Sequence, residues 1–207
     1  MTIDIRYISY QMYSIMFHMD FLGKTEVNMD FLGKTENTSN WPLIPPLPSY
    51  GRGRERPGDR YMSFLHGDGL HDVNGTIDGQ GDIWWNMWRQ RTLQFTRPNL
   101  IEFLNSKNII ISNVIFRNFP FWNIHLVYCS HVVIRYVTIF APADSPNTDG
   151  IDPISSETSG GVENVLLEHI NLSNIGVGIH VKTNIGRGGF IRNITVYDVY
   201  MENSDKG

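Results

Sequence analysis

Two short segments of the sequence combine ionisable side chains at spacings that could support chemistry. The first, Asn147-Thr-Asp-Gly-Ile-Asp152, places the carboxylates of Asp149 and Asp152 three residues apart beside a glycine. Asx-rich segments also form ordinary turns, and a turn is the alternative interpretation. Because an odd spacing on extended chain sends side chains to opposite faces, we expect Asp152 to point away from Asp149. Side chains on opposite faces would not share one site.

The second segment, residues 178–183, is followed by a glycine-rich loop with one arginine at residues 186–189. On a strand, His180 and Lys182 would point to one face and their apolar neighbours to the other. Two basic side chains on one face could bind a carboxylate group. A solvated edge strand is the alternative interpretation.

Short apolar runs rich in Val, Ile, Phe and Tyr must position these side chains, and such runs are typical of β-strands. Four runs share one template, with a polar first residue and apolar residues at the second, fourth and seventh places. They are Asn108 to Val114, His131 to Val137, Asn164 to Ile170 and Asn193 to Val199. The intervals between the starts of successive runs suit one solenoid coil with loops of varying length.

The repeated template predicts an all-β chain folded as a parallel β-helix. Residues at the second and fourth places would face the same side and stack on their equivalents in neighbouring coils. The asparagines that open the runs suit bends, and they could hydrogen-bond up and down the stack. A β-sandwich fits less well, because its strands should alternate more strictly than Ile109-Ile-Ile111 does.

Composition limits the class of protein. A chain of 207 residues suits one domain with a tail, and 41% hydrophobic against 18% charged residues indicates a packed core. With 17 basic and 21 acidic residues the net charge is 17 − 21 = −4, which argues against nucleic acid as a partner. Cys129 is the only cysteine, so one chain can form neither a disulfide nor a cysteine-based metal cluster. We expect a monomer with no metal and no cofactor.

The chain divides into a leader, residues 1–40, and a partial β-helix domain, residues 41–207. In the leader, Met19 to Glu26 recurs as Met29 to Glu36, and two copies are too few for a solenoid. We expect the leader to be flexible and find no secretion signal in it. Prolines predict an extended surface segment from Trp41 to Gly58. No run of about 18 apolar residues occurs, so no membrane span is expected.

Six ordered motifs carry a family resemblance. They are Trp41 to Gly58, Asn74 to Gly81 with Trp84-Trp85, Asn118 to Trp122, Asn147 to Pro153, Ser156 to Gly161, and Lys182-Thr183 with Gly186 to Gly189. In this order they resemble the plant polygalacturonase-like branch of glycoside hydrolase family 28. The resemblance implies a right-handed parallel β-helix, secreted to the cell wall, that hydrolyses α-1,4-linked galacturonate in pectin with inversion at the anomeric carbon.

The resemblance also assigns roles to individual residues. The family uses one aspartate of an Asn-Thr-Asp-Gly motif, here Asp149, and two of a Gly-Asp-Asp motif, which this sequence lacks. Pro153 leads directly into Ile154 and a segment that the family carries later, so the intervening coils are missing here. The family's Arg-Ile-Lys, which binds the substrate carboxylate, corresponds to His180-Val181-Lys182.

Two functions of different classes stay open, a pectin hydrolase and a non-catalytic β-helix that binds anionic polysaccharide. A truncated gene product is a third interpretation. An inverting glycosidase needs two carboxyl groups about 6.5 to 9.5 Å apart, and Asp149 supplies one, so we expect this chain to be inactive. If whole coils are missing, Val132 and Ile134 should stack on Val165 and Leu167, their equivalents in the next run of the template.

Overall fold

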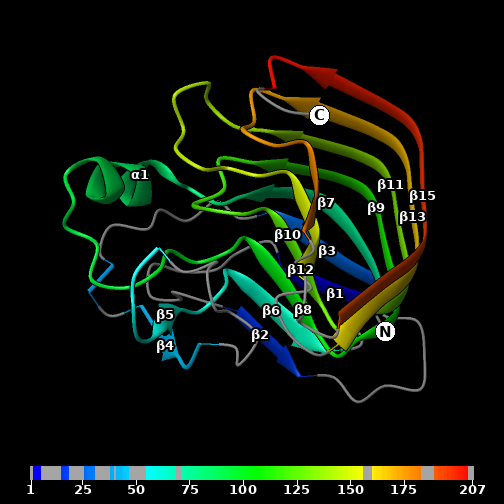
Figure 1. The fold of residues 1–207 in the computed structure, drawn as a ribbon, viewed down its shortest axis with the longest axis horizontal. Helices are drawn as coiled ribbons and strands as arrows, with labels where there is room; N and C mark the ends of the chain where they lie inside the picture. Colours follow the sequence, from blue (N-terminus) through cyan, green and yellow to red (C-terminus); the bar gives the residue numbers. More distant parts are fainter. Residues whose placement is uncertain are drawn as a thin grey trace.

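The computed structural model describes residues 2–5, 15–18, 26–30, 38–39, 41–46, 55–68, 71–155, 160–182 and 189–204. Within these residues, fifteen strands and one helix occur. Successive strands join two sheets alternately, and all neighbours within each sheet are parallel (Figure 1). The chain therefore winds as a parallel β-helix, as the sequence predicts.

Sheet A contains, in spatial order, β1 (Thr2–Ile5), β3 (Glu26–Asp30), β7 (His71–Asp78), β9 (Lys107–Arg117), β11 (Ser130–Phe140), β13 (Gly160–Ser173) and β15 (Gly189–Glu202). Sheet B contains β14 (Ile179–Lys182), β12 (Ile151–Ser155), β10 (Ile124–Val127), β8 (Ile101–Leu104), β6 (Leu65–Asp68) and β2 (Ile15–His18). A separate antiparallel pair is formed by β4 (Leu43–Ile44) and β5 (Arg60–Tyr61).

The long strands of sheet A bend at left-handed residues five positions apart. In and just after β9 these are Asn108, Asn113 and Asn118, with φ of 59°, 57° and 51°. The equivalent bends in the next coils are at His131 and Tyr136, at Asn164, His169 and Asn174, and at Asn193, Asp198 and Asn203. Asparagine tolerates this region better than most residues, because its short polar side chain can hydrogen-bond locally.

The predicted ladders of asparagines are confirmed. Asn193 Nδ2 donates to Asn164 Oδ1 at 2.6 Å, and Asn203 Nδ2 donates to Asn174 Oδ1 at 3.2 Å. These bonds join equivalent bends of successive coils, so each bend helps to fix the position of the next.

The predicted core is also confirmed. The second, fourth and seventh places of the first three template runs are each at most 2% exposed: Ile109, Ile111, Val114, Val132, Ile134, Val137, Val165, Leu167 and Ile170. Val132 pairs with Val165 and Ile134 with Leu167 in register, so β11 and β13 are neighbours. Whole coils are thus stacked in sheet A on both sides of the join between Pro153 and Ile154.

The pairing of β12 with β14 in sheet B is irregular at that join. Ile151 of β12 pairs with Ile179 of β14, whereas Ile154, further along β12, pairs with Val181. The partners in β14 are therefore closer together in the chain than those in β12, and the register shifts between Ile151 and Ile154. This irregularity of the strand pairing lies directly after the segment that carries Asp149.

The segment that opens the predicted β-helix domain is not confined to the surface, contrary to expectation. Trp41 is 3% exposed and meets Trp84 edge to face at a centroid distance of 5.3 Å. Trp84 belongs to α1 (Asp82–Arg89), which the sequence did not predict and which lies across from the curved strands of sheet A (Figure 1). Burial of this large aromatic ring holds the start of the segment against the core, in place of the surface position that the prolines predict.

Most of residues 1–40, including most of the duplicated segment, lies outside the described residues, so the leader boundary stays a prediction. The described parts β1, β2 and β3 continue the two parallel sheets. Within the described residues the one helix, α1, has eight residues, and no helix is long and apolar enough to cross a membrane.

We expect Ile134→Ala to lower the free energy of unfolding by about 2 to 5 kcal/mol, because it leaves a cavity in the centre of the stacked core. Urea denaturation measures this change. Ile115→Ala is the matched control, since Ile115 is 42% exposed on β9 and its truncation should cost less than about 1 kcal/mol. Equal effects of the two substitutions would contradict the assignment of the core.

Candidate active site

Asp149 lies in the loop that leads into β12, and backbone hydrogen bonds fix this loop between two coils. Asn123 N donates to Asp149 O at 3.0 Å, and Gly150 N donates to Val177 O at 2.8 Å. A Cβ at position 150 would lie 2.6 Å from the carbonyl oxygen of Gly178, so this close approach requires glycine. The glycine after Asp149 therefore has a packing role that holds the aspartate in place.

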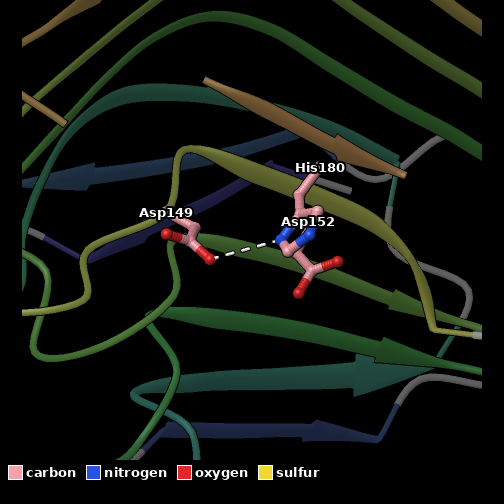
Figure 2. A group of neighbouring side chains, drawn as sticks. All are labelled: Asp149, Asp152 and His180. Carbon is pink, nitrogen blue, oxygen red and sulfur yellow. Dashed lines mark ion pairs between the residues drawn. The ribbon is translucent and has the colours of Figure 1, made fainter. Parts of the chain in front are cut away.

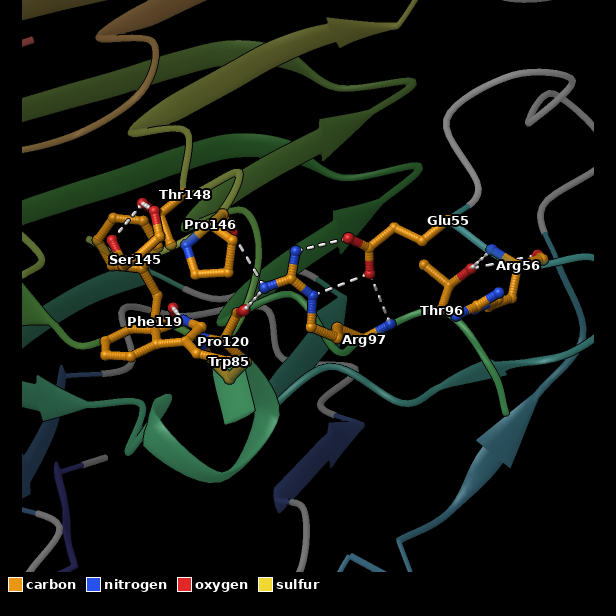
Figure 3. A network of polar contacts seen from close by, with 10 residues as sticks. All are labelled: Glu55, Arg56, Trp85, Thr96, Arg97, Phe119, Pro120, Ser145, Pro146 and Thr148. Atoms are coloured by element: carbon orange, nitrogen blue, oxygen red, sulfur yellow. Dashed lines mark hydrogen bonds and ion pairs between the residues drawn. The ribbon is translucent and has the colours of Figure 1, made fainter. Parts of the chain in front are cut away.

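Arg97 anchors the same loop through a buried guanidinium (Figure 3). Its Nη1 donates to Pro120 O at 2.7 Å and to Pro146 O at 3.0 Å. Its Nε and Nη2 donate to the two carboxylate oxygens of Glu55 at 2.9 and 2.5 Å. The Arg97 guanidinium, paired with Glu55, thus joins the segment after Trp41 to two loops of the β-helix. One of these loops leads to Asp149.

Asp149, Asp152 and His180 come together at one place on sheet B (Figure 2). One ligand atom from each lies within 4.8 Å of the others, and His180 Nδ1 is 3.4 Å from Asp149 Oδ2. Asp149 is 4% exposed and Asp152 is fully buried, whereas the His180 side chain is 25% exposed. His180 therefore forms the solvent-facing side of the group.

The expectation that Asp152 points away from Asp149 is wrong. Alternation holds along continuous extended chain, but β12 begins at Ile151, and Asp149 belongs to the loop before it. The loop geometry therefore sets the direction of Asp149 independently of the strand. As a result, two carboxylates share one site.

The site continues a column of ionisable residues across sheet B. Glu102 of β8 pairs in register with His125 of β10, and His125 pairs with Asp152. His180 follows directly on Ile179, which pairs with the residue before Asp152. Acidic and imidazole side chains therefore alternate along four successive strands.

At the β8 and β10 end of the column, the charge of Glu102 is balanced by its partners. Arg60 donates to both carboxylate oxygens of Glu102 at 2.7 Å, and His125 Nδ1 lies 3.0 Å from Glu102 Oε2. Burial by itself would raise the pKa of Glu102, but the hydrogen bond with His125 and the charge of Arg60 outweigh burial and hold that pKa well below its ordinary value. Glu102 is therefore a buried carboxylate that stays ionised.

An aromatic pair links the column to the Arg97 anchor. Phe121 and Trp122 stack at 4.4 Å in a buried cluster apart from the main core. The Arg97 guanidinium lies 5.0 Å from the Phe121 ring, and the Trp122 ring lies 5.4 Å from that of His125. The motif from Asn118 to Trp122 thus has a structural role beside the site.

Of the residues that the sequence singled out, the structure brings Asp149 and His180 together. Lys182 ends β14, two residues after His180, and its side chain lies outside the described part of the structure. Sequence reasoning missed Glu102 and His125. Their signal was available, because each interrupts an apolar strand at the same place, and their separation in the chain equals that between the first two template runs.

Comparison with known proteins gives consistent results. The family model for Glycosyl hydrolases family 28 matches residues 49–160. A probable polygalacturonase of Vitis vinifera is 37% identical over 79% of this chain and 46% of its own length. An endo-polygalacturonase of Pectobacterium carotovorum is 33% identical over 59% of this chain and 31% of its own length.

Solved structures share the fold. A polygalacturonase from Erwinia carotovora superposes with a TM-score of 0.65 at 21% identity, covering 88% of this chain and 55% of that protein. An exopolygalacturonase from Thermotoga maritima gives a TM-score of 0.58 at 16% identity, covering 91% and 55%. The chain spans about half the length, or less, of these relatives.

We expect Glu102→Gln to destabilise the chain by about 3 kcal/mol at pH 7, because it leaves Arg60 and His125 without their carboxylate. The pKa of Glu102 is lower in the folded state than its unfolded-state pKa of 4.5. The ionised carboxylate therefore stabilises the fold above pH 4.5, and this stabilisation is lost as pH falls toward the folded-state pKa. The difference between wild type and Glu102→Gln should therefore shrink as pH falls below about 4.5.

Urea denaturation at several pH values measures this difference. Asp144→Asn is the control, because the Asp144 side chain is 78% exposed and its substitution should have little effect at any pH. A difference between wild type and Glu102→Gln that stays constant down to pH values near 2 would contradict the depressed pKa.

Proposed function

This chain belongs to Glycosyl hydrolases family 28, and we propose that it recognises the α-1,4-linked galacturonan of pectin through a site centred on Asp149. The observation that carries the proposal is the position of Asp149, held beside His180 at the edge of sheet B by the Asn-Thr-Asp-Gly segment. The relatives named polygalacturonase support this substrate class.

In this proposal each site residue has a distinct role. Asp149 is the catalytic carboxylate of the family's first motif. His180 and Lys182 bind a uronate carboxylate. His180 does so with a partly exposed ring, and Lys182 with a compact ammonium charge that can donate hydrogen bonds to it. A cell-wall location and a monomeric state complete the proposal, by family resemblance.

The burial of Asp152 favours binding without turnover. An inverting glycosidase leaves room for a water between two carboxyl groups about 6.5 to 9.5 Å apart. Oxygens of Asp149 and Asp152 lie within 4.8 Å, and Asp152 is fully buried. Asp152 is therefore a poor second catalytic group because its carboxylate is fully buried, not because it points away from Asp149.

This observation favours a second candidate function, a non-catalytic β-helix that binds anionic polysaccharide. The two candidates share Asp149, His180 and Lys182 and differ only in turnover. A transcript with codons for a Gly-Asp-Asp segment between Pro153 and Ile154 would instead support a truncated gene product.

We expect the purified chain to release no more reducing ends from polygalacturonate than Asp149→Asn does. Loss of one acid–base group typically costs about 10²- to 10⁴-fold in rate, and the family's Gly-Asp-Asp pair has no counterpart here. A reducing-sugar assay with an active endo-polygalacturonase in parallel measures this. Release by wild type that disappears in Asp149→Asn would contradict the expectation and support the hydrolase.

We expect oligogalacturonate to bind, and Lys182→Ala to weaken binding by about tenfold, because a hydrogen bond to a charged group contributes roughly 1.5 kcal/mol or more. Isothermal titration calorimetry measures both affinities. Lys107→Ala is the matched control, since Lys107 is exposed at the start of β9 in sheet A. If wild type and Lys182→Ala bind equally well, the role proposed for Lys182 is wrong.

A further inference from the structure

Asp152 is a buried carboxylate whose charge lacks compensation within the described part of the chain. Its side chain is fully buried, and neither oxygen accepts a hydrogen bond from any described residue. Buried charges in proteins are paired or coordinate metals, because desolvation of an isolated ion is very costly. Glu102, two strands away, shows the compensated arrangement, with Arg60 and His125 on its oxygens.

The neighbours of Asp152 increase this imbalance. A carboxylate oxygen of Asp149, itself 4% exposed, lies within 4.8 Å of the ligand atom of Asp152. The two buried carboxylates therefore lie close together, and a divalent cation bound between them would neutralise the charge that Asp152 leaves unpaired among the described residues. The buried carboxylate of Asp152, unpaired within the described part of the chain and beside a second carboxylate, therefore suits a divalent metal ion.

The geometry between His180 and Asp149 is also that of two ligands of one metal. Their Nδ1 and Oδ2 atoms are 3.4 Å apart, yet His180 Nδ1 is buried and makes no hydrogen bond within the described residues. Two ligands bound tetrahedrally at about 2.0 to 2.1 Å are about 3.3 Å from each other. The two atoms are thus separated as ligands are, without the angles of a direct hydrogen bond.

We propose that Asp149, Asp152 and His180 form a binding site for one divalent transition-metal ion, of which Zn²⁺ is the test ion. Two carboxylate oxygens and one imidazole nitrogen are ligands that Zn²⁺ accepts, and three protein ligands leave a fourth position for water or a carboxylate. The sequence predicted no metal. Its pattern could not reveal this site, because the three ligands come from a loop and two different strands. The proposal does not depend on any turnover of polysaccharide.

Titration of tag-free, chelator-treated protein tests the proposal. We expect one equivalent of Zn²⁺ to bind by isothermal titration calorimetry, and Co²⁺ in its place to give d–d absorption bands. Asp152→Asn and His180→Gln should each weaken binding by more than the roughly 10- to 100-fold that loss of an outer partner costs. Zn²⁺ should raise the Tm of wild type and leave that of the two variants unchanged.

His169→Gln is the matched control, because His169 pairs with Asp198 at 2.6 Å on the surface of sheet A and should bind Zn²⁺ as wild type does. If Asp152→Asn fails to fold, His180→Gln decides the test, since the ring is partly exposed. Absence of stoichiometric binding by wild type would overturn the proposal and leave His180 as a bridge between two carboxylates. Binding retained in His180→Gln, or lost equally in His169→Gln, would also overturn it.

The outcome is separable from that for the proposed function. A chain that binds Zn²⁺ but not oligogalacturonate would support this inference and contradict the substrate class. A chain that binds oligogalacturonate but not Zn²⁺ would do the reverse.

Discussion

Equal register between successive coils is the constraint on which the structure depends. Each coil must bend at equivalent residues, since the parallel backbone hydrogen bonds and the inward side chains align only if the bends align. Left-handed residues such as Asn108, Asn113 and Asn118 supply these bends at intervals of five. Asparagine bonds between coils, such as that from Asn193 to Asn164, then reinforce the alignment.

The same register builds the site. Because sheet B pairs equivalent positions of successive coils, one ionisable residue per strand is enough to create a column of neighbouring ionisable side chains. Glu102 and His125 form its compensated part with Arg60, whereas Asp152 lacks such a partner among the described residues. The stacking of equivalent positions therefore builds an aliphatic core along sheet A and brings buried ionisable residues together along sheet B.

Long-range anchors then fix the loop that carries Asp149. Arg97 connects Glu55 with the carbonyls of Pro120 and Pro146, and Gly150 lets two coils approach closely. These contacts join segments that are 42, 23 and 49 residues from Arg97 in sequence. The position of the catalytic candidate is thus a property of several coils and of the segment that covers them.

The sequence by itself determined the stack, because the template at Ile109, Ile111 and Val114 repeats locally and one buried face per strand fixes its register. It also pointed to Asp149 and His180 through their motifs. Only the tertiary structure decided that Asp152 joins them, that Trp41 is buried, and that Arg97 anchors the loop. Alternation along a strand describes neighbours in the chain, whereas these contacts depend on how a loop enters its strand and on which coils lie side by side.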